Sequence, residues 1–133
     1  VSINNNLKIL FCIGENLNEK KTKKTKKIIT NQIINGLKNI KNINNIIFAY
    51  EPIWSIGTGV IPKKDDLINI VIFIKRVLKK KFQVKTSKVL YGGSVNPINI
   101  QELGKINVID GFLIGGASQS SNKFIDIIKK TFN

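Results

Sequence analysis

The chain has 133 residues and a mass of 14.9 kDa, which is the length of one ordinary domain. Hydrophobic residues make up 42% of the sequence, including 26 isoleucines, so a disordered chain is excluded. The apolar runs are shorter than the roughly 18 residues of a membrane-spanning helix, and we expect no membrane association. The single cysteine, Cys12, permits no internal disulfide and indicates a reducing, cytoplasmic location.

The net charge of +14 comes from 22 basic and 8 acidic residues. Lysine supplies 21 of the 22 basic residues, whereas proteins that read DNA bases favour the two-pronged guanidinium of arginine. Isoleucine, lysine and asparagine together fill 64 of 133 positions, and A/T-rich codons encode all three. Genome composition therefore explains the charge, and we expect no nucleic-acid partner. DNA binding with stronger salt sensitivity than that of other lysine-rich proteins would favour the opposite interpretation.

Apolar runs and helical patterns alternate along the chain. A buried strand over Leu7–Ile13 is followed by a helix over Glu19–Ile40, whose apolar face is Ile29, Ile33, Ile34 and Leu37. A strand over Ile46–Tyr50 precedes a helix over Asp65–Lys81, with two aspartates at its N-terminus. A strand over Val89–Tyr91 precedes a short helix that starts at Asn96-Pro97 and ends at Gly104. A fourth strand over Ile109–Ile114 and a helix over Asn122–Phe132 complete the order.

The order βαβαβαβα predicts an α/β domain over residues 1–133, with four parallel strands and helices outside them. Such units form either a small doubly wound sheet or half of an eightfold barrel, since a complete barrel needs about 250 residues.

Unusual residues follow each predicted strand, at the end where α/β folds bind ligands. They are Gly14-Glu15, Glu51–Gly59, Gly92-Gly93-Ser94 and Gly115–Ser118. Glu51 is either a general base or a strand-end carboxylate that caps a helix or pairs with a lysine. The glycine-bearing loops either bind phosphate through backbone N–H groups or form tight turns.

Residues Pro52–Pro62, which we call the lid segment, contain two glycines, Gly57 and Gly59, a proline at each end and the only tryptophan of the sequence, Trp54. The segment is either a movable lid that excludes water or an ordinary surface loop with Trp54 packed on the body. Cys12 is predicted to be a small buried residue, because the sequence has no histidine to activate it as a nucleophile. The absence of histidine also removes the commonest metal ligand, and no metal site is predicted.

Four segments resemble the triosephosphate isomerase family in order and spacing. AYEPIWSIGTG (49–59) is similar to that family's catalytic strand end and lid. FCIGE (11–15), YGGSV (91–95) and DGFLIGGAS (110–118) are similar to its fifth, seventh and eighth strand ends. The resemblance implies that the chain is the C-terminal half of a (β/α)8 barrel.

The resemblance also implies a role for each matching residue. Glu51 is the base that moves a proton between adjacent carbons of a phosphorylated triose, which interconverts dihydroxyacetone phosphate and D-glyceraldehyde 3-phosphate through an enediolate. No metal or organic cofactor takes part. Backbone N–H groups of Gly57, Ser94, Gly115 and Gly116 hold the phosphate, and Leu113 lies beneath the substrate. Pro52, Ile53 and Trp54 form the first lid hinge, and Glu15 accepts a hydrogen bond from Trp54 in the closed lid.

Two departures from the family pattern stand out. The family's Asn and Lys after strand one and His after strand four have no counterpart here, so the chain is expected to be a fragment that is inactive alone. A homodimer in the cytoplasm, acting in glycolysis and gluconeogenesis, is expected of the full-length parent. At the second hinge, Pro62 takes a position whose N–H bonds the family tyrosine matching Tyr91, and proline has no N–H. The alternative function is a non-catalytic phosphate-binding half-barrel.

Overall fold

The computed structural model describes residues 7–132, so residues 1–6 and 133 of the predicted domain lie outside the described part. Three parallel strands form one sheet in the order β1-β2-β3. They are β1 (Ile9–Ile13), β2 (Ile46–Tyr50) and β3 (Val89–Tyr91). The register pairs Ile13 with Tyr50 and Tyr50 with Tyr91, so the three strands end on one rim.

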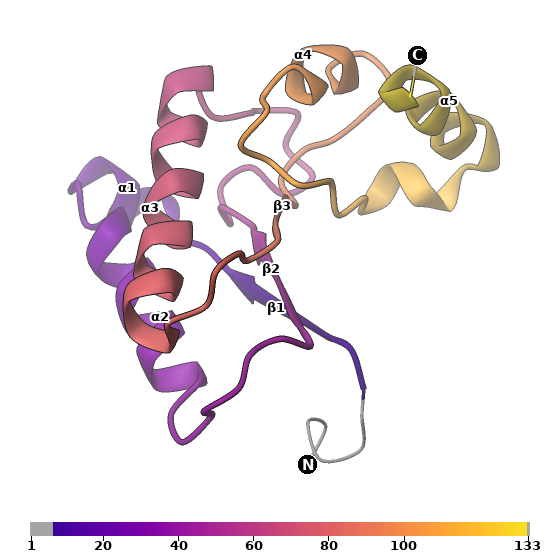
Figure 1. The fold of residues 1–133 in the computed structure, drawn as a ribbon. Coiled ribbons are helices and arrows are strands. Elements are labelled where there is room, and N and C mark those ends of the chain that lie inside the picture. The colour runs from indigo at the N-terminus through magenta and orange to yellow at the C-terminus, as the bar shows by residue number, and fades with distance from the viewer. Residues whose placement is uncertain (1–6, 133) are drawn as a thin grey trace.

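The helices are α1 (Leu17–Lys21), α2 (Thr25–Gly36), α3 (Lys64–Phe82), α4 (Ile100–Gly104) and α5 (Ser121–Phe132), with a 3-10 turn η2 (Gly116–Gln119). Helices α2 and α3 lie on one side of the sheet, and α4 and α5 lie together beyond β3 (Figure 1). None of the helices in residues 7–132 is both long enough and apolar enough to cross a bilayer. The α/β class with parallel strands is as predicted.

The core lies between the sheet and helices α2 and α3. In α3, the buried residues Leu67, Ile70, Val71, Ile74 and Leu78 recur every three or four positions and form one face. Asp65 and Asp66 in the first turn and lysines in the last turn complement the helix dipole. The sheet contributes Phe48, which is fully buried. The bounds of α3, β2 and β3 agree with the predicted ones to within one residue.

The first predicted helix, Glu19–Ile40, is wrong as a single element. Helix α1 ends at Lys21, and Lys23 adopts the left-handed conformation with φ 57°. The Thr22 hydroxyl donates to the Asn18 carbonyl at 2.8 Å and closes the end of α1. Helix α2 then stops at Gly36, where a Cβ would collide with the ring of Phe11 on β1. Ile34 is 40% exposed, so it does not belong to the predicted buried face.

The predicted fourth strand, Ile109–Ile114, is also wrong as a strand. It makes a single parallel bridge, from Tyr91 to Phe112. The backbone runs beside β3, with the Leu113 N–H donating to the Tyr91 carbonyl at 2.9 Å. However, the Val89 N–H donates to the Asp110 carboxylate at 2.7 Å. That side-chain bond takes the place of a backbone bond and interrupts a regular ladder.

The short helix after β3 begins later than predicted. Residues 97–99 form a turn, and α4 starts at Ile100. Asn96 still has a capping role, because its Oδ1 accepts the N–H groups of Ile98 (2.8 Å) and Asn99 (3.1 Å). The predicted end at Gly104 is confirmed.

Candidate active site

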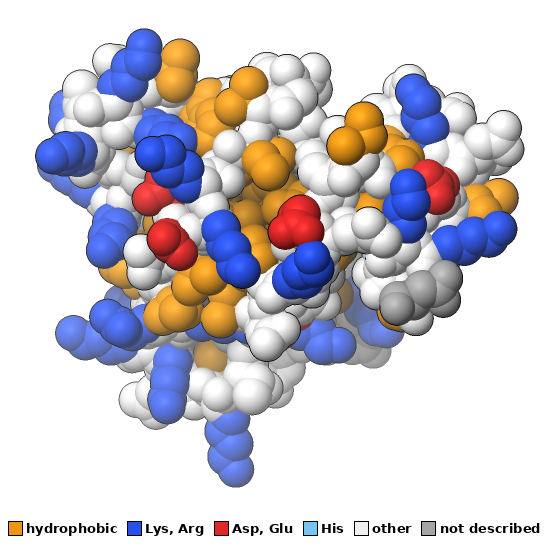
Figure 2. Space-filling model, turned by 90° about the horizontal axis from the view of Figure 1, so that it is seen from above, with side chains coloured by type: hydrophobic (Ala, Val, Ile, Leu, Met, Phe, Trp, Pro, Cys, Tyr) orange, Lys and Arg blue, Asp and Glu red, His pale blue; other side chains and the backbone are white. Residues whose placement is uncertain are grey.

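Six of the predicted site residues line one cavity of about 800 Å³ at the rim where the strands end. They are Glu51, Gly57, Ser94, Leu113, Gly115 and Gly116. Three separate segments of the chain supply them, after β2, after β3 and at the start of η2. Seen from above, apolar side chains gather at the centre, with basic side chains mainly towards the edges and acidic side chains between them (Figure 2). The fold therefore brings a carboxylate and glycine-rich loops together, and Lys123 also lines the cavity.

Glu51 follows β2 directly and is half-buried. Its N–H donates to the Ile13 carbonyl at 2.8 Å, which continues the pairing of β1 with β2. Its side chain lies against the backbone of Gly92, where an added Cβ would stand 2.6 Å from Glu51 Cγ and 2.9 Å from Oε1. A glycine at position 92 therefore leaves the space that the carboxylate occupies.

The loops predicted to bind phosphate differ in whether their N–H groups already donate a hydrogen bond within the protein. Within residues 7–132, Gly57 and Gly115 donate these groups to no acceptor. Ser94 instead donates its N–H to Ser55 Oγ at 3.2 Å. Asn99 fixes the same loop by donating its side-chain amide to the Ser94 carbonyl at 2.9 Å. Gly57 has φ 70°, a conformation that favours glycine.

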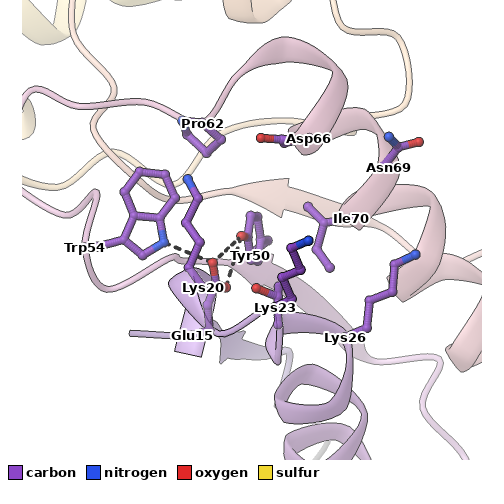
Figure 3. Close-up of a pocket in the computed structure, with 11 residues that line it drawn as sticks. Glu15, Lys20, Lys23, Lys26, Tyr50, Trp54, Pro62, Asp66, Asn69 and Ile70 are labelled. Atoms are coloured by element: carbon purple, nitrogen blue, oxygen red, sulfur yellow. Dashed lines mark hydrogen bonds between the residues drawn. The ribbon is translucent and has the colours of Figure 1, made fainter. Parts of the chain in front are cut away.

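The first hinge of the lid segment is anchored on a buried carboxylate. Glu15 is 1% exposed and accepts hydrogen bonds from Trp54 Nε1 at 2.9 Å and from the Tyr50 hydroxyl at 3.0 and 3.1 Å (Figure 3). Burial, and then the Glu15 charge, raise the pKa of Tyr50 far above its usual range, so this hydroxyl keeps its proton. Ile53 donates its N–H to the Glu15 carbonyl at 3.0 Å. The Trp54–Glu15 contact that the resemblance implies is present.

A model of the family described as "Triosephosphate isomerase" matches residues 1–131. The chain belongs to the triosephosphate isomerase family. It is 40% identical over 129 residues to the triosephosphate isomerase of Thermodesulfovibrio yellowstonii, covering 96% of this chain and 52% of the relative. The Leptospira interrogans triosephosphate isomerase is 39% identical over 132 residues, 94% of this chain and 53% of the relative. The Neurospora crassa enzyme is 38% identical over 130 residues, 96% of this chain and 52% of the relative.

The chain thus spans about half the length of these triosephosphate isomerases. Membership of the family confirms the predicted fold class, a half of an α/β barrel with parallel strands.

The predicted lid residues differ in how far their side chains are exposed. Pro52 and Tyr91 are fully buried, whereas Ile53 is 59% exposed. Pro62 lines a second cavity, of about 480 Å³, together with Glu15 and Trp54.

The prediction that Cys12 is buried is wrong, since its side chain is exposed. Strand alternation explains this position. Phe11 and Ile13 point towards the helices, so Cys12 points to the opposite face of the sheet. Cys12 pairs in register with Ala49, two residues before Glu51, and therefore shares a face with that carboxylate. Partial burial, and next the hydrogen bond and charge of Glu51, raise the pKa of the Cys12 thiol to about 11. The thiol stays protonated near neutral pH.

Two further contacts at the lid segment were missed from the sequence. The Lys20 ammonium lies 3.4 Å from the centroid of the Trp54 ring, beside the indole in Figure 3. Ser55 is fully buried, and its hydroxyl bonds Val60 within the lid segment, Tyr91 at the end of β3 and Ser94 in the loop after β3. A polar residue between the apolar Trp54 and Ile56 was the available signal for Ser55. Among residues 7–132, no three His, Cys, Asp or Glu side chains converge as a metal site would require.

Proposed function

We propose that this chain carries the base and the phosphate-binding loops of a triosephosphate isomerase, which interconverts dihydroxyacetone phosphate and D-glyceraldehyde 3-phosphate without a cofactor. The observation that carries the proposal is the convergence of Glu51 with Gly57, Ser94, Gly115 and Gly116 on one cavity. Family membership over residues 1–131 supports it.

In the proposed reaction, the Glu51 carboxylate removes a proton from one carbon of the triose phosphate and returns it to the adjacent carbon. The electron pair left by the proton forms the enediolate between the two steps, and a proton passes from the substrate hydroxyl oxygen to the former carbonyl oxygen, which completes the exchange of the two groups. Gly57 and Gly115 offer N–H groups to the phosphate, which fixes the reacting carbons relative to Glu51. The lid segment excludes water, so the enediolate does not eliminate its phosphate.

The carbonyl of the substrate also needs a polarising group. The family places that group on the other half of the barrel, and the present sequence contains no histidine. We therefore propose that residues 1–133 alone bind a phosphate but do not isomerise a triose. Three apolar side chains are exposed, Leu10 on β1 and Ile125 and Ile128 on α5. Their exposure supports the proposal that the other half of the barrel packs against them.

The test joins residues 1–133 to the N-terminal half of the Thermodesulfovibrio yellowstonii relative, which this chain does not cover. We expect isomerase turnover from this hybrid barrel and none from the chain alone. Glu51→Gln should lower turnover by about 10²–10⁴-fold, the usual contribution of a general base. Glu102→Gln is the control, because Glu102 is an exposed carboxylate that pairs with Lys105 on the surface.

A folded hybrid without turnover, next to an active relative assembled from its own halves, would contradict the proposal. Phosphate binding in that inactive hybrid would instead support the second candidate, a non-catalytic phosphate-binding half-barrel. That candidate is favoured by one observation, the presence of all four predicted phosphate loop residues in this chain. The cytoplasmic location, the role in glycolysis and gluconeogenesis, and a homodimeric parent are proposals that rest on family membership alone.

A further inference from the structure

The Ser55 hydroxyl joins three parts of the rim. It lies 2.5 Å from the Val60 carbonyl in the lid segment and 3.0 Å from the Tyr91 hydroxyl at the end of β3. It also lies 3.2 Å from the Ser94 nitrogen in the loop that is proposed to bind phosphate. Ser55 itself is 0% exposed, so none of these bonds has water as a ready substitute.

The direction of each bond follows from the atoms present. The Val60 carbonyl can only accept a hydrogen bond, so the Ser55 hydroxyl donates its single proton to that bond. The Ser94 N–H can only donate, so Ser55 Oγ accepts it. The Tyr91 hydroxyl then donates to the remaining lone pair of Ser55 Oγ. Ser55 therefore donates once and accepts twice, which fills the capacity of a hydroxyl group.

This arrangement leaves little room for substitution around it. A Cβ at Gly93 would stand 2.6 Å from Ser55 Oγ and would also collide with the Tyr91 hydroxyl. Pro62 has no N–H to offer Tyr91, so the lid segment meets Tyr91 through the Ser55 hydroxyl instead. A side chain thus makes the connection that a backbone group could not make at Pro62.

We propose that Ser55 is a positioning residue that couples the lid segment to the phosphate site by occupying the Ser94 N–H until an anion displaces it. The inference rests on the proposed function of Ser94. A phosphate oxygen and Ser55 Oγ are both acceptors for the same N–H, so they compete for it. An anion at Ser94 releases one of the two bonds by which Ser55 ties the lid segment to β3 and the loop after it.

The experiment titrates inorganic phosphate into the 133-residue chain and follows the Ser94 amide signal by NMR. Ser55→Ala removes the competing acceptor, and we expect phosphate to bind about three- to tenfold more tightly, the factor of one net hydrogen bond. General damage to the site would weaken binding instead. Thr58→Ala breaks bonds that stay inside the lid segment, to Trp54 and Ser55 carbonyls, and should not give this gain.

Hydrogen exchange without phosphate tests the same bond independently. The Ser94 amide should exchange faster in Ser55→Ala than in the unmodified chain, and as slowly as before in Thr30→Ala, a half-buried hydroxyl remote from the rim. If Ser55→Ala is unfolded by circular dichroism, Ser55→Cys keeps the volume, weakens the bonds and should shift both measurements in the same direction.

Unchanged exchange at Ser94, or phosphate affinity that stays the same or falls in a folded Ser55 variant, would overturn the inference. If exchange accelerates as expected but phosphate leaves the Ser94 amide unmoved in every variant, Ser94 is no phosphate ligand. That outcome contradicts the proposed function of Ser94 and, with it, the coupling.

Discussion

Substituting Gly92 with alanine should displace Glu51 and slow the proposed proton transfer. The new Cβ would stand 2.6 Å from Glu51 Cγ. Carbon atoms in contact prefer about 3.5–4.0 Å, so relief requires a shift of about 1 Å. A misplacement of that size costs on the order of 10²-fold in turnover. The backbone bond from the Gly92 N–H to the Tyr50 carbonyl is compatible with alanine, so the loop itself should keep its position.

The assay measures kcat and KM of the hybrid barrel with triose phosphate. We expect the loss in kcat, with KM changed much less, because the Gly92 N–H is bonded to the Tyr50 carbonyl and is not one of the groups proposed to hold the phosphate. Gly104→Ala is the matched control, since a Cβ at Gly104 meets nothing within 4 Å. Urea unfolding of both variants separates a displaced carboxylate from a loss of folded protein. Undiminished kcat in a folded Gly92→Ala variant would refute the placement of Glu51 as the base.

Three further predictions concern the core, the Cys12 thiol and the second hinge of the lid segment. Ile74→Ala should lower the free energy of unfolding by about 2–5 kcal/mol, because Ile74 is 0% exposed. Ile72→Ala, at a residue of the same helix that is 38% exposed, should lower it much less. Equal losses in urea unfolding would contradict the packing of α3. The rate at which Cys12 reacts with a disulfide reagent should rise with pH and level off above the thiol pKa of about 11. Glu51→Gln should lower that pKa, because the negative charge of Glu51 disfavours the thiolate. An unchanged pH profile in the variant would count against contact between Cys12 and Glu51. Pro62→Ala supplies an N–H at the second hinge and should change turnover or loss of the intermediate in the hybrid; if neither changes, the hinge hypothesis fails.

The sequence predicted β2 and β3 well because both are short apolar runs that end at a proline or at paired glycines. It did not predict the break between α1 and α2, because nothing in the composition of Thr22–Lys24 announces a left-handed residue. The apolar content of Ile109–Ile114 was read correctly, but the pairing was not. A carboxylate from Asp110 takes the Val89 N–H, and such a tertiary contact has no local signature.

The site was predictable to the extent that parallel strands place their ends on one rim. That rule alone brings Glu51 and the glycine loops together, as the cavity shows. Cys12, Lys20 and Ser55 escaped because their contacts depend on which side of the backbone each side chain takes. Cys12 was within reach of an alternation argument from Glu51 back along the register, whereas the three bonds of Ser55 needed coordinates.

The most direct test of Glu51 as the base is the transfer of solvent deuterium to the substrate. Dihydroxyacetone phosphate is incubated in D₂O with the hybrid barrel. Deuterium on its hydroxymethyl carbon, next to the carbonyl, is measured by NMR. With Glu51 present, we expect deuterium to enter at a rate comparable to turnover, since the abstracted proton exchanges with solvent on the carboxylate. With Glu51→Gln, incorporation should fall by about 10²–10⁴-fold, in step with turnover. Incorporation by the Gln variant at the unmodified rate would contradict the assignment.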